Sequence, residues 1–268
     1  MMADCPSCMK RDDELEELSK EAFAKAKEEV EELGGKRAFV KGDWLLTLVR
    51  KSFRNFWDRA TPEYFSEKYG TTDEDFLLKK LTKVASRNAT MLGATAGAAI
   101  SADTLAGLAG VPFTGGLSVP AALAIGGSIL MTEALMLTRL QLRMVAQIGK
   151  AMKIPLDPDD PEDILIILAF ALGGSAADTA GKFGMKVGGH LTKGLIKRHI
   201  AKDTLKAIQR IGAKIGVKIL QRTIVKYAVP AASILIGGGW NFVSTKAVAK
   251  TAKKHFLRRR SENAEITE

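Results

Sequence analysis

The basic segment from Lys182 to Arg260 most constrains how this 268-residue chain can fold. It holds nineteen Lys or Arg residues and a single acid, Asp203, so it carries +18 where the whole chain carries +10. Within it, basic residues recur at every fourth position with Ile and Leu between them: Lys202, Lys206, Arg210, Lys214, Lys218, Arg222 and Lys226. This spacing is helical rather than strand-like, so it predicts an amphipathic helix with a cationic stripe.

The composition favours helices for the rest of the chain as well. Hydrophobic residues make up 46% of the sequence but aromatic residues only 6%, and there are 25 glycines. Small aliphatic residues in this proportion favour closely packed helices over a β-sandwich. We therefore predict an all-α multi-helix bundle with long central Ala/Gly-rich helices and an amphipathic, basic C-terminal helix pair.

Start and stop signals place the helices approximately. Charged residues 11–33 end at two glycines, Asp43 is a candidate N-cap for the next helix, and Thr72-Asp73 begins a third. A long helix is predicted over 118–152 and a last one from Tyr227 or Pro230 to Arg260. The uncharged stretch 104–132 is interrupted by prolines, which favours burial, although a hairpin dipping into a bilayer stays open.

Charge divides the chain into three parts. Residues 1–35 form an acidic N-terminal arm with eleven acids and five bases, residues 36–260 form a single helical domain, and residues 261–268 form an acidic tail. Opposite charges in one chain raise the alternative that the arm folds over the basic face.

Residues that could perform catalysis or hold a metal are sparse. His190, His199 and His255 lack metal-binding spacing, and Cys5 and Cys8 could supply only half of a zinc or redox site. The acids of 157–163 are read as a helix start, with Asp160 as N-cap, rather than as a calcium loop. Residues 174–182 lack the spacing of a phosphate-binding loop. We expect no enzyme activity, no metal and no cofactor.

The C-terminal helix carries a recognisable pattern. Pro230 precedes a triple glycine, then Trp240-Asn241, an alanine-rich stretch, Phe256 and a closing Arg258-Arg259-Arg260. This resembles the C-terminus of the EcsC family, and the similarity extends over roughly residues 75–260. The resemblance implies an accessory protein encoded beside an ABC transporter and brings no catalytic residues. The triple glycine departs from the family pattern.

These observations favour a peripheral protein that binds anionic lipid at the inner face of a membrane, and the resemblance implies an accessory role beside an ABC-type transporter. The predicted headgroup-binding residues are Lys202, Lys206, Arg210, Lys214, Lys218, Arg222, Lys226, Lys253, Lys254, Arg258, Arg259 and Arg260. The predicted membrane-facing apolar residues are Trp44, Phe53, Trp57, Trp240 and Phe242. The first residues lack the basic and apolar regions of a signal peptide, so we expect no cleaved signal, and the few cysteines suit a reducing compartment, so a cytoplasmic location is expected.

Two other functions stay open from the sequence. Nucleic acid would also attract the +18 segment, but the stripe alternates with Ile and Leu rather than with stacking aromatics. The chain could instead be a soluble regulatory or scaffold subunit of a membrane complex. An extended form of the lipid hypothesis adds an apolar groove that shelters a lipid tail.

Overall fold

The computed structural model describes residues 21–22, 24–100, 118–154, 156–157, 160, 163, 166–168, 170, 201–228 and 233–267. All regular secondary structure in these residues is helical, which confirms the all-α class for this part of the chain. The helices with defined bounds are α2 (Gly35–Lys41), α3 (Trp44–Arg59), α4 (Pro62–Tyr69), α5 (Glu74–Ala99), α7 (Ser118–Ala151), α11 (Ala201–Ala228) and α12 (Ser233–Thr267).

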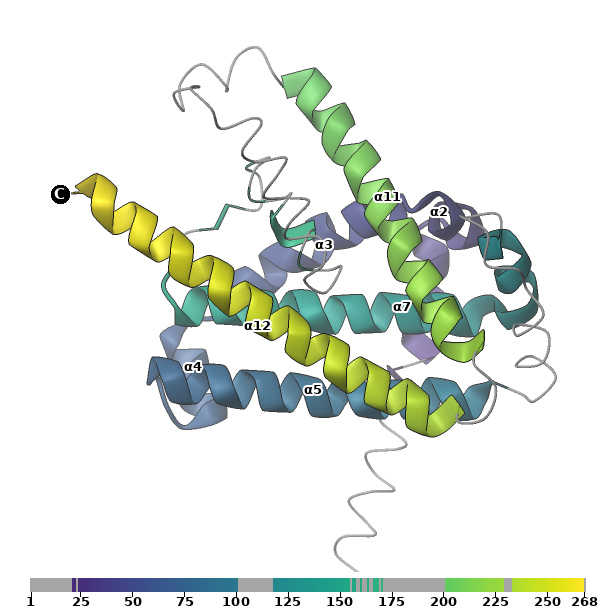
Figure 1. Ribbon diagram of the computed structural model, residues 1–268, viewed down its shortest axis with the longest axis horizontal. Helices are drawn as coiled ribbons and strands as arrows, with labels where there is room; N and C mark the ends of the chain where they lie inside the picture. Colours follow the sequence, from purple (N-terminus) through teal and green to yellow (C-terminus); the bar gives the residue numbers. More distant parts are fainter. Residues whose placement is uncertain are drawn as a thin grey trace, which may run out of the picture.

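Helix α7 is the central element, and α2, α3, α5, α11 and α12 all pack against it (Figure 1). Its bounds agree with the predicted 118–152, and side chains such as Leu135, Leu142 and Val145 are fully buried. A break at Gly127 (φ 50°, ψ −135°) divides it into two helical pieces. Such a φ is in the region that favours glycine, so the kink falls where the sequence allows it.

Helices α11 and α12 cross the near face of the molecule in Figure 1, in front of α7. Helix α12 also runs along α5 and makes its most extensive contacts there. Helices α11 and α12, which carry seven Lys or Arg residues each, therefore lie on one side of the bundle.

The two predicted helix starts at Asp73 and Asp43 differ in how they are capped. The Asp73 carboxylate accepts a hydrogen bond from the Phe76 backbone N–H at 2.8 Å, which caps α5 as expected. Asp43 does precede α3, but its side chain makes no capping hydrogen bond.

Part of the predicted acidic arm, residues 1–35, belongs to the helical bundle. Residues 24–32 are helical, and Ala26, Val30 and Leu33 are buried in the main core. Glu29 forms an ion pair with Arg139 of α7 at 2.9 Å. Residues 21–35 thus pack as part of the bundle because their apolar face is covered, while residues 1–20 lie outside the described residues. The predicted acidic tail likewise continues α12 as far as Thr267.

Among the described residues, no helix combines the length and the apolar character needed to cross a membrane. Residues 104–117 of the possible hairpin region 104–132 lie outside the described part of the chain.

Candidate functional site: a basic face, a buried ion pair and a cavity

Four residues of the predicted stripe form an exposed ridge on α11. Arg210, Lys214, Lys218 and Arg222 are all exposed. The side chains of Lys202 and Lys206 lie outside the described part of α11. The stripe is therefore a surface feature over at least three helical turns.

Lys226, the last residue of the predicted stripe, was assigned wrongly. Lys226 is only 3% exposed, and its Nζ pairs with Oε1 of Glu133 in α7. A helix turns about 100° per residue, so a spacing of four drifts about 40° per step. From Arg210 to Lys226 the drift reaches roughly 160°. The sequence periodicity thus brings Lys226 round to the inner side of α11, and a lipid headgroup cannot reach it.

Asn241 of α12 completes the buried cluster around this pair. Its Nδ2 donates to Glu133 Oε1 at 2.9 Å, and its Oδ1 accepts from Lys226 Nζ at 3.3 Å. The ammonium also lies 4.4 Å from the ring centroid of Tyr227. Glu133 Oε2 has no hydrogen-bond partner among the described residues. Three helices are therefore joined by one buried polar cluster.

Burial controls the ionisation of this cluster. Loss of solvent lowers the pKa of Lys226, and the Glu133 carboxylate opposes that shift. Burial also raises the pKa of Tyr227, with the same carboxylate adding to the effect. Glu133 was not predicted from the sequence as a functional residue, because a single acid inside a long apolar helix carries no spacing signal.

Helix α12 carries a second exposed ridge that combines apolar and basic side chains. Trp240 and Val243 are 49% and 65% exposed, and they are followed by the exposed lysines Lys246, Lys250 and Lys254. The Lys246 Nζ lies 4.3 Å from the ring centroid of Phe242, a predicted apolar residue that is partly buried. Lys246 and Lys250 were absent from the predicted set. Their spacing of four from Lys254 could have identified them.

Three of the predicted C-terminal headgroup residues are engaged within the molecule. Lys253 pairs with Asp75 at 3.3 Å and Arg260 with Glu74 at 2.9 Å, both at the start of α5, while Arg259 pairs with Asp163. These contacts hold α12 against its neighbours. Lys254 and Arg258 are exposed.

Two of the predicted membrane-facing aromatic residues are core residues. Trp44 and Phe53 are 0% exposed, and Trp44 stacks on Phe39 with ring centroids 4.6 Å apart. An amphipathic pattern specifies an apolar face but not whether protein or lipid covers it, which explains the error. Trp57 is partly buried and Trp240 is exposed, as a contact residue would be.

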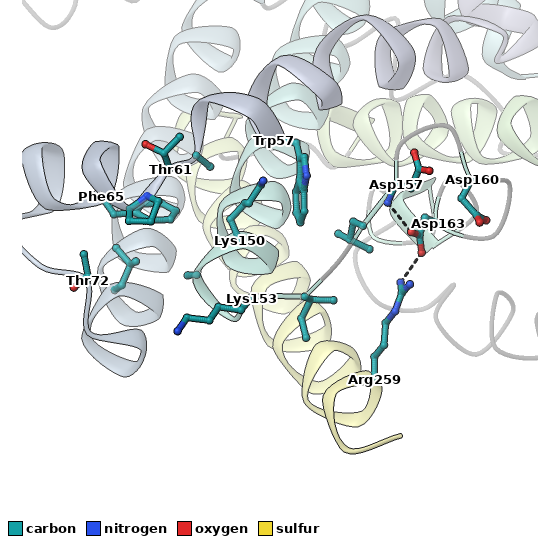
Figure 2. Close-up of a pocket in the computed structure, with 16 residues that line it drawn as sticks. Trp57, Thr61, Phe65, Thr72, Lys150, Lys153, Asp157, Asp160, Asp163 and Arg259 are labelled. Atoms are coloured by element: carbon teal, nitrogen blue, oxygen red, sulfur yellow. Dashed lines mark hydrogen bonds and ion pairs between the residues drawn. The ribbon is translucent and has the colours of Figure 1, made fainter. Parts of the chain in front are cut away.

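A cavity of about 1030 Å³ lies where the ends of α3 and α7 meet the start of α4 and Arg259 of α12 (Figure 2). Its lining includes Asp157, Asp160 and Asp163 from the acidic segment. The Asp163 carboxylate is buried, pairs with Arg259 and accepts from the Asp157 backbone N–H at 2.7 Å. These acids thus contribute to tertiary structure, beyond the helix start that was predicted.

The described residues contain no group of three or more His, Cys, Asp or Glu side chains that could hold a metal ion. Cys5, Cys8, His190 and His199 lie outside these residues, and His255 packs against Phe170 with ring centroids 5.6 Å apart.

Comparison of the chain with protein-family models, with curated proteins and with solved structures found no match in any of the three. The resemblance to the EcsC family therefore stays a prediction.

Proposed function

We propose that this protein binds anionic membrane surfaces peripherally, through the face formed by α11 and α12. The observation that carries the proposal is the outer ridge of α12, where exposed Trp240 and Val243 continue into Lys246, Lys250 and Lys254. Tryptophan favours the headgroup region of a bilayer, and lysine favours its anionic surface.

The α11 ridge supports the same surface. Arg210, Lys214, Lys218 and Arg222 are exposed on the helix that crosses α7 beside α12 (Figure 1). Each basic residue near an anionic bilayer contributes about 1 kcal/mol. Seven cations from the two ridges would thus suffice for stable attachment without a membrane-spanning helix. Nucleic acid is the less favoured partner, because exposed Trp240 and Val243 add apolar area that phosphate contacts do not use.

The resemblance to EcsC proteins fits an accessory role beside a transporter at the inner face of the membrane. We propose that role as the setting in which this surface acts. The resemblance adds no residue to the α11–α12 face.

Sedimentation with vesicles tests the proposal. Wild-type protein is mixed with phosphatidylcholine vesicles that contain either no phosphatidylglycerol or about one third of it. We expect binding to require the anionic lipid and to fall with added salt. The variant Lys246→Gln/Lys250→Gln/Lys254→Gln should bind about 100-fold more weakly, since three lysines contribute about 3 kcal/mol.

The matched control removes three exposed cations from α3, in Arg50→Gln/Lys51→Gln/Arg54→Gln, because α3 lies behind α7 in Figure 1. This variant should bind as wild type does. Equal losses in both variants would show that net charge, and not the α11–α12 face, governs attachment. Equal binding to neutral and anionic vesicles would reject the charge mechanism.

A further inference from the structure

Five large apolar side chains are exposed in the described part of the chain, and all five lie on two helices. Phe76 and Met91 of α5 are 54% and 37% exposed, and Trp240, Val243 and Leu257 of α12 are 49%, 65% and 41% exposed. Single exposed apolar residues are common on protein surfaces, but here they are restricted to two helices that pack against each other. The α5–α12 pair therefore carries an apolar surface that no described part of the molecule covers.

Two contacts fix how α5 and α12 run past each other. A Cβ atom added at Gly238 would lie 3.1 Å from the Thr90 carbonyl oxygen, and Lys253 pairs with Asp75 at 3.3 Å. Moving forward along α12 between these contacts means moving backward along α5, so the helices are antiparallel. The same number of residues separates the two contacts on both helices, so one register holds along the pair (Figure 1).

This register sorts the exposed apolar residues into two groups. Met91 lies at the level of α12 that carries Trp240 and Val243, and these three residues form the first apolar group. Phe76 lies beside the C-terminal half of α12, which carries Leu257, and these two residues form the second apolar group. From Val243 to Leu257 the helix rises by roughly 20 Å, at about 1.5 Å per residue.

Both groups lie on the side of the helices that faces away from α7. Helices α5, α7 and α12 pack against one another in pairs, so each of them turns its exposed face outward. Exposed residues recur at spacings that keep them on one face of each helix: Val243, Lys250, Lys254 and Leu257 on α12, and Phe76, Lys83 and Arg87 on α5. A flat surface laid against this side would contact both helices at once.

Exposed cations occupy the surface between the two apolar groups. They are Lys79, Lys83 and Arg87 on α5 and Lys246, Lys250 and Lys254 on α12. No acidic residue occurs in residues 76–99 or 233–261. This side of the α5–α12 pair therefore combines positive charge with apolar side chains. That combination complements an anionic bilayer, whose surface attracts cations and whose interface accepts apolar residues.

We propose that α5 and α12 lie flat against the anionic bilayer, with their axes along its plane and both apolar groups inserted into the interface. The proposal rests on the membrane binding proposed above and extends the contact from α11 and α12 to α5. Trp240 and Val243 alone would hold one end of α12 and leave the other end to tilt away, whereas Phe76 and Leu257 hold the second end. Nucleic acid is the less favoured occupant, because phosphate contacts would leave both apolar groups in water.

Quenching by labelled lipid tests this orientation in the full chain. Cys5 and Cys8 are changed to serine, and Val243→Cys, Leu257→Cys or Thr47→Cys then supplies a single site for the fluorophore NBD. The anionic vesicles used above carry a nitroxide high on the phosphatidylcholine chain. We expect the labels at Val243 and Leu257 to be quenched to a similar extent, and the label at Thr47, an exposed residue of α3, to stay unquenched.

Each other outcome contradicts the orientation in a different way. Quenching at Val243 without quenching at Leu257 would overturn the flat contact and leave membrane binding itself standing. Equal quenching at Thr47 would overturn it as well, because no single face would then contact the bilayer. If the labelled proteins do not sediment with anionic vesicles, the membrane proposal fails and this one fails with it.

Two variants measure what α5 and the second apolar group contribute to affinity. Lys79→Gln/Lys83→Gln/Arg87→Gln should weaken binding to anionic vesicles about 100-fold, as three basic residues at such a surface provide. Phe76→Ser/Leu257→Ser should weaken binding about tenfold, because less apolar area enters the interface. All five side chains are exposed, so circular dichroism of both variants should match wild type.

The matched control is the α3 variant described above, Arg50→Gln/Lys51→Gln/Arg54→Gln. It removes the same number of exposed cations as the α5 charge variant and should bind as wild type does. Wild-type affinity of both the charge variant and the apolar variant, with weakened binding of the α12 triple-lysine variant, would reject the flat contact and retain the α11–α12 face.

Discussion

Glu133, Lys226 and Asn241 meet in the core from α7, α11 and α12, and water does not solvate their charges. Desolvation of each ion costs several kcal/mol, so the pair is favourable only while both partners are present. The polar cluster thereby specifies how these three helices are placed relative to one another, since an alternative packing would leave a buried charge unpaired.

The first prediction concerns this pair. Lys226→Met should lower the free energy of unfolding by about 3–5 kcal/mol, because Glu133 is left buried without a counter-ion, and Glu133→Leu should have a similar effect through Lys226. The double variant Glu133→Leu/Lys226→Met should recover most of the loss, since apolar residues of similar size replace both charges. Urea unfolding monitored by circular dichroism measures all three.

The result that contradicts this prediction is additivity, in which the double variant loses the sum of the two single losses. That outcome would mean that each side chain stabilises the fold through separate contacts. Lys246→Met, at an exposed lysine of α12, serves as the control and should change stability little.

The sequence could predict which residues are basic and helical, but not which of them are buried. The exposed basic residues Arg210, Lys214, Lys218 and Arg222 and the buried Lys226 all recur at every fourth position of α11. The difference arises because each step of four residues turns the side chain about 40° further around α11. Which residue becomes buried can be predicted only once the exposed face of the helix is known. Trp44 and Trp240 show the same limit: both are aromatic residues on helices, and only tertiary packing buries the first.

At the scale of elements, α11 crosses the turn between α2 and α3 so closely that the two backbones are in contact. A Cβ atom added at Gly216 would lie 2.4 Å from the Gly42 carbonyl oxygen, and one added at Gly42 would lie 1.8 Å from the Ala213 carbonyl oxygen. Gly42 also has a φ of 81° at the end of α2. No side chain fits between these two segments, so their glycines fix how closely α11 approaches.

The second prediction uses the two glycines of α11. Gly216→Ala should destabilise the protein by several kcal/mol, because backbone atoms must move apart to accept the methyl group. Gly212→Ala is the matched control, one helical turn away, where the nearest atom is the Leu46 Cβ at 3.5 Å. That substitution should be neutral or stabilising by up to about 1 kcal/mol, as alanine favours helix. Thermal unfolding of both variants checks the difference, and equal Tm values would contradict it.

Element bounds were largely predictable where local chemistry sets them. The ends of α7 and the Asp73 cap of α5 followed from composition and capping signals. Glycines four residues apart, such as Gly212 and Gly216, allow close helix packing, but the neighbour of Gly216, Gly42, is far away in the sequence and has no spacing relation to it. The cavity was missed for the same reason, because its lining comes from four separate stretches of the sequence, 57–65, 72–77, 150–163 and Arg259.

At the scale of the whole molecule, charge separation is the main property that links structure to the proposed function. Basic ridges lie on α11 and α12, whereas the acids of α5 are partly used in ion pairs with α12. The acidic segment 1–35 divides into residues 21–35, which pack into the bundle, and residues 1–20, which carry six acids and three bases. The part of the acidic arm that could cover the basic face is therefore residues 1–20.

The last prediction follows from that division. Deleting residues 1–20 changes the net charge from +10 to +13 and leaves Ala26, Val30 and Leu33 in the core. If the acidic residues shield the α11–α12 face, the deletion should raise binding to anionic vesicles several-fold at low salt, and less above 0.5 M salt, where screening acts within a few ångströms. A full-length variant with Asp12, Asp13 and Glu14 changed to Asn, Asn and Gln removes the same net charge without shortening the chain, so it should reproduce the gain. Unchanged vesicle binding of both the deletion and the charge variant would exclude the cover. Stronger binding of the deletion alone would show that the length of the segment, rather than its charge, shields the face.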